Sequence, residues 1–175
     1  MFSAGREPLE FSPYAPRWYA SYTRSRYEKQ VARELNQRGV ESFLPLYEQI
    51  HHWSHDHRKV QLPLFPGYVF VHIPLRNRLC VLQIPGVVRL VSVKGEPAPI
   101  DDAEIETLRL ALANSAHTEP CPYIKLGQQV RIESGPLQGL CGKVLRKNHH
   151  LRVVISIDLL MRSILVDVDA NRLAA

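Results

Sequence analysis

The segment Leu62–Ile73, LPLFPGYVFVHI, constrains the fold more than any other part of the chain. Proline presets its own φ and glycine accepts the positive φ that follows, so Pro66-Gly67 predicts a tight turn. The β-branched and aromatic residues after the turn favour a strand, in which successive side chains point to opposite faces. One face of this strand carries the aliphatic residues Val69, Val71 and Ile73, and the other carries Tyr68, Phe70 and His72.

The aliphatic face is the natural core face of the strand. The opposite face, with two aromatic rings and an imidazole, has two interpretations. It is either the inner face of a sheet that is covered on both sides, since buried aromatic residues are common in cores, or a partly exposed aromatic patch that binds a partner. The strand alone leaves both interpretations open.

Composition narrows the class of protein. The chain has 175 residues, 45% of them hydrophobic, which suits one large domain or two small ones. No apolar run reaches the roughly 18 residues that a membrane span needs. Residues 1–16 lack the apolar core of a secretory signal, so we expect a flexible tail there. The three cysteines, none in a CxxC pair, fit a reducing compartment. We therefore expect a cytoplasmic protein without membrane association.

The first part of the chain combines strand and helix patterns. Residues 17–22 are typical of a strand, and Ser25 with Glu28 forms a capping box that predicts the start of a helix, which Gly39 ends. The later patterns predict, in chain order, a hairpin with arms at 47–53 and 59–64 and a polar tip at 54–58, a short helix behind Pro74, a strand at 87–93 and a helix capped by Asp101. This succession indicates an α+β sandwich with an antiparallel sheet.

The second part of the chain has an all-β pattern. Residues 115–124 contain two prolines and no periodicity, so we expect a linker there. Short strands are predicted at 129–132, 142–146, 151–157 and 164–168. They suit a small barrel, because closure removes exposed strand edges. The expected organisation is a tail at 1–16, an α+β domain at 17–114, the linker at 115–124 and a barrel domain at 125–175.

Catalytic motifs are few. The sequence contains no GxSxG, P-loop or HExxH pattern. Four histidines gather around the expected hairpin tip, at His51, His52, His55 and His57. Only Asp56 accompanies them, which makes a solvated loop the simpler interpretation and a metal site the other. We expect neither an enzyme nor a bound cofactor or metal.

Basic side chains are more informative. A net charge of +5 and a pI of about 9.3 permit binding to a polyanion. Basic residues stand at the ends of expected elements or on the hairpin, namely Arg24, Arg26, Arg58, Lys59, Arg76 and Arg78. Each alone suits a solvated surface. Together they would form a phosphate-facing rim if the fold brought them to one side.

Several motifs resemble the NusG family of transcription elongation factors. The opening Trp18-Tyr19, the helix with Glu28 and the segment Leu64–Val71 resemble the N-terminal domain of that family. Residues 130–144, VRIESGPLQGLCGKV, are similar to its C-terminal KOW motif. The match covers residues 17–172, and it implies a NusG-type α/β sandwich followed by a small SH3-like KOW barrel.

The resemblance implies a transcription elongation or antitermination factor that binds the clamp helices of RNA polymerase and suppresses pausing or termination. The positions that match the family's docking residues are Tyr22, Phe65, Tyr68 and Phe70. We expect a monomer that contacts nucleic acid, either non-template or upstream DNA, through Arg24, Arg26, Arg76 and Arg78.

One branch of the family is more similar than the rest. Segments Gly39–Tyr47 and Leu62–Leu64 resemble specialised paralogs, which include RfaH-like and capsule-operon antiterminators. A polar motif of the RfaH branch aligns near Asn77–Leu79, where the residue types of this chain differ. The resemblance therefore points to a specialised paralog without supporting that contact.

The stretch Asp158–Arg162 carries three large apolar residues between two expected strands, although such connections are usually polar. It either seals one end of the barrel or binds a partner through Leu159, Leu160, Met161 and Arg162. The resemblance implies a ribosomal protein or the Rho termination factor as partner, although the family's Phe-Gly-Arg is missing. The β-branched residues around it predict an all-β domain rather than a helical hairpin. The alternative function is that of a KOW-containing RNA-binding or ribosome-associated protein.

Overall fold

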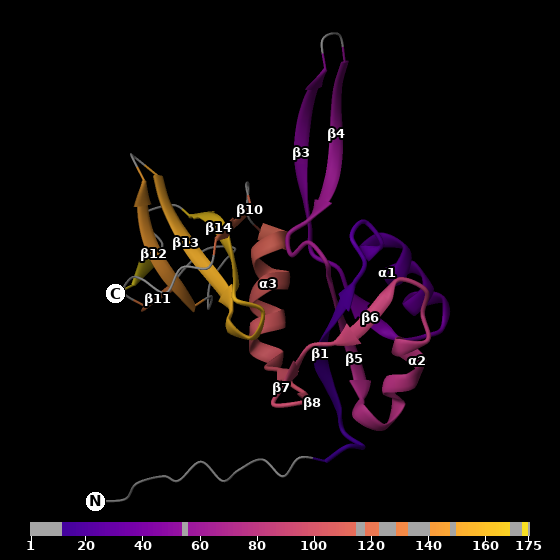
Figure 1. The fold of residues 1–175 in the computed structure, drawn as a ribbon. Helices are drawn as coiled ribbons and strands as arrows, with labels where there is room; N and C mark the ends of the chain where they lie inside the picture. Colours follow the sequence, from indigo (N-terminus) through magenta and orange to yellow (C-terminus); the bar gives the residue numbers. More distant parts are fainter. Residues whose placement is uncertain are drawn as a thin grey trace, which may run out of the picture.

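The computed structural model describes residues 12–53, 56–114, 118–122, 129–132, 141–147, 150–168 and 173–174. Within these residues the chain forms a first sheet with helices, a projecting hairpin and a second, purely β part (Figure 1). The expected α+β class is confirmed.

The first sheet is antiparallel, and its strand order is β2-β5-β1-β6, with β9 paired to β1 as well. Its strands are β1 (Pro16–Thr23), β2 (Glu41–Phe43), β5 (Tyr68–Pro74), β6 (Val87–Leu90) and β9 (Pro99–Ile100). β1 lies in the middle, because it pairs with β5 along one edge and with β6 and β9 along the other. The strand predicted after Pro66-Gly67 is β5, which lies between β2 and β1.

Helices cover the aliphatic face of this sheet. They are α1 (Glu28–Gln37), the 3₁₀ turn η1 (Leu75–Asn77) and α2 (Arg78–Leu82). Val31, Leu35 and Val81 on the helices are fully buried against Val69 and Val71 of β5. Burying a Val or Leu side chain contributes about 1.5–3 kcal/mol, so this layer is a main source of stability. The predicted core face is confirmed.

The expected capping box is wrong. The N-cap residue of α1 is Tyr27, and no side chain caps this end of the helix. The Glu28 side chain is buried, and its Oε1 accepts a hydrogen bond from the backbone N–H of Gly67 at 2.8 Å. A buried carboxylate needs such a donor, and the N–H of the Pro66-Gly67 turn supplies it. Glu28 therefore fixes a turn 39 residues away instead of the start of its own helix.

The hairpin consists of β3 (Leu46–Trp53) and β4 (Asp56–Pro63), which, among the described strands, pair only with each other. It projects away from the rest of the chain (Figure 1). The strands extend further than predicted, since Asp56 already pairs with Trp53, and Ser54-His55 lies outside the described residues. At the base of the hairpin, Lys29 Nζ donates to the carbonyl oxygen of Gln61 at 2.7 Å and ties the hairpin to α1.

The predicted strand at 87–93 is divided. After β6 the chain forms a small hairpin of β7 (Ser92–Val93) and β8 (Glu96–Pro97), and Val91 belongs to neither strand. The Val91 N–H donates to the Ala20 carbonyl, and its own carbonyl accepts from Ala98, so Val91 joins the sheet to the small hairpin. Helix α3 (Asp102–Asn114) follows β9 and lies between the first sheet and the second part of the chain (Figure 1).

The second part has the strand order β10-β14-β13-β12-β11-β15, all antiparallel. Its elements are β10 (Thr118–Pro122), β11 (Gln129–Ile132), β12 (Cys141–Lys147), β13 (His150–Ile157), the 3₁₀ turn η2 (Asp158–Leu160), β14 (Arg162–Val168) and β15 (Leu173–Ala174). The predicted strands are confirmed. β10 lies inside the expected linker, so residues 118–122 belong to the second sheet; the division into domains stays a prediction.

One apolar cluster joins the two parts. The first sheet contributes Trp18, Ala20 and Phe70, and the turn before β5 contributes Leu64 and Phe65. Helix α3 contributes Ile105, Leu108 and Ala111, and the second sheet contributes Ile155, Ile157, Leu160, Ile164 and Val166. The cluster runs from the aromatic face of the first sheet through α3 to the second part, because α3 lies between them.

Candidate functional site

The register of the first sheet divides its aromatic face into three cross-strand rows. They run from the end of β1 near Tyr22, here called the open end, to the end near Trp18 that α3 covers. Residues directly opposite each other on antiparallel strands share a face, and their side chains contact. The first row, at the open end, is Arg89, Tyr22 and Tyr68 on β6, β1 and β5. The second row is Ala20, Phe70 and Phe43, and the third is Trp18, His72 and Glu41.

The first row is exposed to solvent. The rings of Tyr22 and Tyr68 are 5.5 Å apart at an interplanar angle of 53°. The guanidinium carbon of Arg89 lies 5.6 Å from the centre of the Tyr22 ring, within the range of a cation–π interaction. The Tyr22 side chain is 37% exposed, Tyr68 is partly buried and Arg89 is exposed. Large aromatic side chains beside an arginine are typical of protein interfaces.

The second row is fully buried at Ala20 and Phe70 and partly buried at Phe43. The ring of Phe70 packs against Phe43 at 6.1 Å and edge-on against Phe65 at 5.7 Å. Phe65 is 1% exposed and Phe70 is fully buried. Both belong to the cluster that includes Ile155 and Leu160 of the second part. The structure therefore separates the four expected docking residues into two tyrosines that solvent reaches, Tyr22 exposed and Tyr68 partly buried, and two buried phenylalanines.

The third row is held by polar contacts to α3. The His72 ring stacks on Trp18 at 4.9 Å, and its Nδ1 lies 2.8 Å from Glu41 Oε2. Arg109 of α3 donates to Glu41 Oε1 at 3.3 Å, and its guanidinium lies 5.0 Å from the Trp18 ring centre. The hydrogen bond from His72, together with that from Arg109, lowers the pKa of Glu41 below its ordinary value of 4.5. These contacts fix α3 over the covered end of the face.

The stretch Asp158–Arg162 meets the same cluster. Leu160 is 7% exposed and belongs to the cluster, and Leu159 packs against it. Met161, in a left-handed conformation with φ of 49°, is 60% exposed, and Arg162 is exposed too. The two leucines expected to bind a partner of the second domain therefore lie in the same cluster as the two phenylalanines expected to bind the polymerase.

Two Pro-Gly turns support the open end. Gly67 has a φ of +85°, and a Cβ on it would lie 3.3 Å from the Tyr22 ring. Gly86 has a φ of +98°, and its Cβ would lie 2.6 Å from the Tyr27 ring. The carbonyls of these glycines accept hydrogen bonds from Thr23 and Arg24, each at 2.8 Å. Since only glycine has both the conformation and the space, these turns hold the end of β1 in one position.

The four expected DNA-contacting arginines do not form one rim. Arg24 and Arg26 follow β1 at the open end of the sheet, whereas Arg76 follows β5, which runs in the opposite direction. About seven residues of strand separate the two places, on the order of 20 Å. The guanidinium of Arg76 lies 5.0 Å from the Tyr14 ring, and Arg78 begins α2. The structure thus pairs Arg24 with Arg26 and places Arg76 elsewhere.

The remaining expectations concern metal and membrane. Among the residues that the structure describes, no group of three or more His, Cys, Asp or Glu side chains is arranged to hold a metal ion. The four histidines expected at the hairpin tip, His51, His52, His55 and His57, have side chains that lie outside the described part of the structure. No helix in the described part of the chain is long and apolar enough to cross a membrane.

Sequence reasoning missed Arg89 and Arg109. Arg89 lies in β6, within the predicted strand at 87–93, but its place beside Tyr22 depends on the register of β1 with β6. Arg109 lies in a helix that was predicted correctly, but Glu41 is 68 residues away along the chain. No local pattern signals either contact. The two residues become visible only when strand pairing and helix packing are known.

Comparison with known proteins gives a consistent result. Residues 16–109 match the family model described as "Transcription termination factor nusG". The chain is 28% identical over 172 residues to the transcription termination/antitermination protein NusG of Pseudomonas aeruginosa, covering 90% of this chain and 97% of that one. It is 27% identical over 175 residues to the same protein of Staphylococcus carnosus, covering 91% and 95%.

A solved structure agrees with these relatives. The structure described as "Domain interaction in Thermotoga maritima NusG" is similar with a TM-score of 0.52 and 25% identity, covering 92% of this chain and 97% of that one. The family model spans more than half of the chain, and the relatives match along nearly all of it. The aromatic face, the Pro66-Gly67 turn and the all-β second part thus stand in a chain that belongs to the NusG family of transcription factors.

Proposed function

We propose that this protein is a transcription elongation or antitermination factor that binds RNA polymerase through the aromatic face of its first sheet. The observation that supports the proposal is that Tyr22, Tyr68 and Phe70 lie on one face of paired strands. Phe65, in the turn before β5, packs against Phe70. The family resemblance assigns these positions to the clamp helices of the polymerase. Bound there, the protein suppresses pausing or termination by favouring one polymerase conformation, which requires preferential binding to that state.

The arrangement of the two parts sets a condition on this binding. Phe65 and Phe70 are buried in a cluster to which Ile155 and Leu160 contribute. A polymerase helix reaches the two phenylalanines only when their cover, α3 with the second part packed on it, has moved away. The apparent affinity is then reduced by the fraction of molecules that are open. We infer that polymerase binding and the contact between the two parts are competing equilibria.

The second part has its own proposed partner. Leu159, Leu160, Met161 and Arg162 become jointly accessible once the cluster opens, because the two leucines are then released. A methionine at such a tip suits an adaptable apolar contact. The partner that the family resemblance suggests is a ribosomal protein, with Rho as the other candidate.

Contact with DNA is proposed for the arginines at the open end of the sheet. Arg24 and Arg26 lie beside the first row and follow β1 directly. They suit the phosphates of the non-template strand or the upstream duplex, since arginine contacts to phosphate fix the register of a protein on nucleic acid. Arg76 and Arg78 lie at other element ends, and would contact a separate stretch of DNA.

The proposal is tested by measuring the affinity of the full chain for core RNA polymerase. Phe70→Ala is a poor probe, because removing a buried phenylalanine costs about 3–5 kcal/mol of folding stability. Tyr68→Ala is better, because Tyr68 is only partly buried. We expect it to weaken binding by about 2 kcal/mol, roughly thirtyfold.

A matched control is Tyr14→Ala. Tyr14 is 67% exposed and lies over Arg76, beyond the other end of β1. This variant should bind like the parent. If the folded Tyr68→Ala variant binds polymerase with the same affinity as the parent, the assignment of this face as the polymerase-binding surface is contradicted.

A further inference from the structure

We propose that the first row, Arg89, Tyr22 and Tyr68, is a recruitment site that binds an acidic segment of the polymerase while the two parts of the chain are still packed together. This inference rests on the proposed function and adds an order of events to it. Contact begins at the row that solvent reaches, and the buried phenylalanines engage afterwards. It also gives Arg89 a role in choosing the partner.

The burial pattern carries the first step. Tyr22 is 37% exposed, and Arg89 is exposed, in the arrangement that buries Phe70 completely. Val88, the residue before Arg89, is 51% exposed, which extends the accessible surface along β6. A partner therefore finds one end of the docking face available before the cluster opens.

The charges around the first row indicate that its partner is acidic. Arg89 lies over the Tyr22 ring, and Arg24 and Arg26 are exposed in the segment that directly follows β1 at the same end of the sheet. The nearest carboxylate along the chain, that of Glu28, is buried and already accepts the hydrogen bond from Gly67. The exposed charges named here are all positive, and a positively charged surface favours a negative partner and speeds its association.

The geometry of the rings favours a protein segment over a nucleobase. Bases bind single-strand readers by stacking flat on an aromatic ring. Here the Arg89 guanidinium lies over the Tyr22 ring at 5.6 Å, and the Tyr68 ring is tilted by 53° against it. The pair offers no parallel slot for a base. Tyrosine rings beside an arginine instead fit a helix that presents an apolar side chain next to a carboxylate.

The row is also held in place before it binds. The Pro66-Gly67 turn packs under Tyr22, and the hydrogen bond from Thr23 to the Gly67 carbonyl closes the end of β1. A surface that is already ordered loses little conformational entropy on binding. This suits a site that must bind partners quickly from the packed state.

The test measures the association rate constant of the full chain with core RNA polymerase that carries no nucleic acid. Arg89→Glu should lower this rate by about tenfold and reduce its dependence on salt, because a charge at the edge of an interface acts mainly on association. Arg89→Lys keeps the charge and should retain most of the rate. Circular dichroism of each variant checks that the chain is folded.

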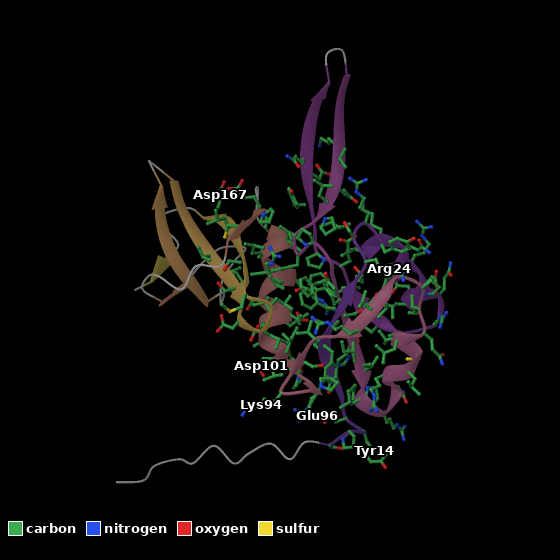
Figure 2. All side chains as sticks on the ribbon, in the orientation of Figure 1. Tyr14, Arg24, Lys94, Glu96, Asp101 and Asp167 are labelled. Atoms are coloured by element: carbon green, nitrogen blue, oxygen red, sulfur yellow. The ribbon has the colours of Figure 1, made fainter. Side chains whose placement is uncertain are left out.

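Lys94→Glu is the matched control. It makes the same change of charge on an exposed residue in the β7–β8 turn. Lys94 lies away from Arg24, which marks the end of the sheet that carries the first row (Figure 2). This variant should associate at the parental rate. Equal rates for the Arg89→Glu and Lys94→Glu variants, with a parent that binds, would overturn the recruitment site and leave the proposed function intact.

Two further outcomes separate the hypotheses. If the parent does not bind polymerase at all, the proposed function fails and the recruitment site fails with it. If Arg89→Glu weakens binding to a single-stranded oligonucleotide while the polymerase rate is unchanged, the occupant is nucleic acid, and the inference of an acidic protein segment is wrong.

Discussion

The two faces of the first sheet are buried in different ways. The aliphatic face packs under α1 and α2, which are joined to the strands by short connections. The aromatic face packs under α3, and the same apolar cluster continues from α3 into the second part, where it includes Ile155 and Leu160. The cover of the aliphatic face is part of the same folding unit, whereas Ile155 and Leu160 lie more than 80 residues beyond Phe70 along the chain. The second part can leave while the first sheet stays folded, so only the cover of the aromatic face is suited to regulation.

The largest effect is expected from a charge in the permanently covered face. Val71→Asp places a carboxylate among Val31, Leu35 and Val81, where the described residues offer it no charged partner. The cost should exceed about 4 kcal/mol and unfold the first part of the chain. Chemical denaturation followed by circular dichroism measures it. A folded variant of near-parental stability would show that this face also opens.

A charge in the separable cover should act differently. Leu160→Asp can escape to solvent when the second part leaves the cluster, so we expect a loss of only about 2–3 kcal/mol. Hydrogen exchange should rise around Phe65 and Phe70, while the backbone of α1 keeps its protection. Parental protection around both phenylalanines would mean that the two parts do not separate there.

Glu28 tests how the turn beside the docking face is held. Glu28→Gln keeps an acceptor for the Gly67 N–H but removes its charge, so the free energy of unfolding should fall by about 1 kcal/mol. The matched change Glu34→Gln, on the same helix, removes a surface pair with Arg38 and should cost less. Equal losses for the two variants would argue against a special role for the buried contact.

The smallest effect concerns pH. The folded-state pKa of Glu41 lies below its ordinary value of 4.5, chiefly because His72 donates a hydrogen bond to it. Its stabilising effect is therefore complete above about pH 4.5 and is lost as the pH falls through the depressed pKa. Since the Glu41 side chain is 53% exposed, solvent screening keeps the effect small.

The variant Glu41→Gln isolates this contribution. The stability difference between parent and variant should shrink as the pH falls below 4.5, measured by denaturation over a pH series. A difference that grows on acidification would reverse the sign expected for a carboxylate with a lowered pKa.

Local patterns were sufficient for most elements. Alternation in Tyr68–Ile73 gave the correct core face, and β-branched residues gave the strands of the second part. Both signals depend on neighbours in the sequence. The family resemblance grouped Tyr22 with Tyr68, and the register of β1 with β5 places the two residues on one face.

Long-range contacts explain what the sequence could not predict. Glu28 has a serine at the right spacing for a capping box, yet the N–H of Gly67 in a buried site competes more strongly for its carboxylate. The burial of Phe65 and Phe70 depends on a sheet that lies far along the chain, and local periodicity carries no information on that packing. Binding surfaces that are shared between two parts of one chain are therefore the hardest features to predict.

The central claim is that the docking face and the second part compete. The most direct test is the affinity of the full-length Leu160→Asp variant for core RNA polymerase, compared with that of the parent. If opening the cluster exposes Phe65 and Phe70, the variant should bind more tightly, because a larger fraction of molecules is competent. If the variant is folded and opened, by hydrogen exchange, but binds no more tightly than the parent, the competition between the two parts is contradicted.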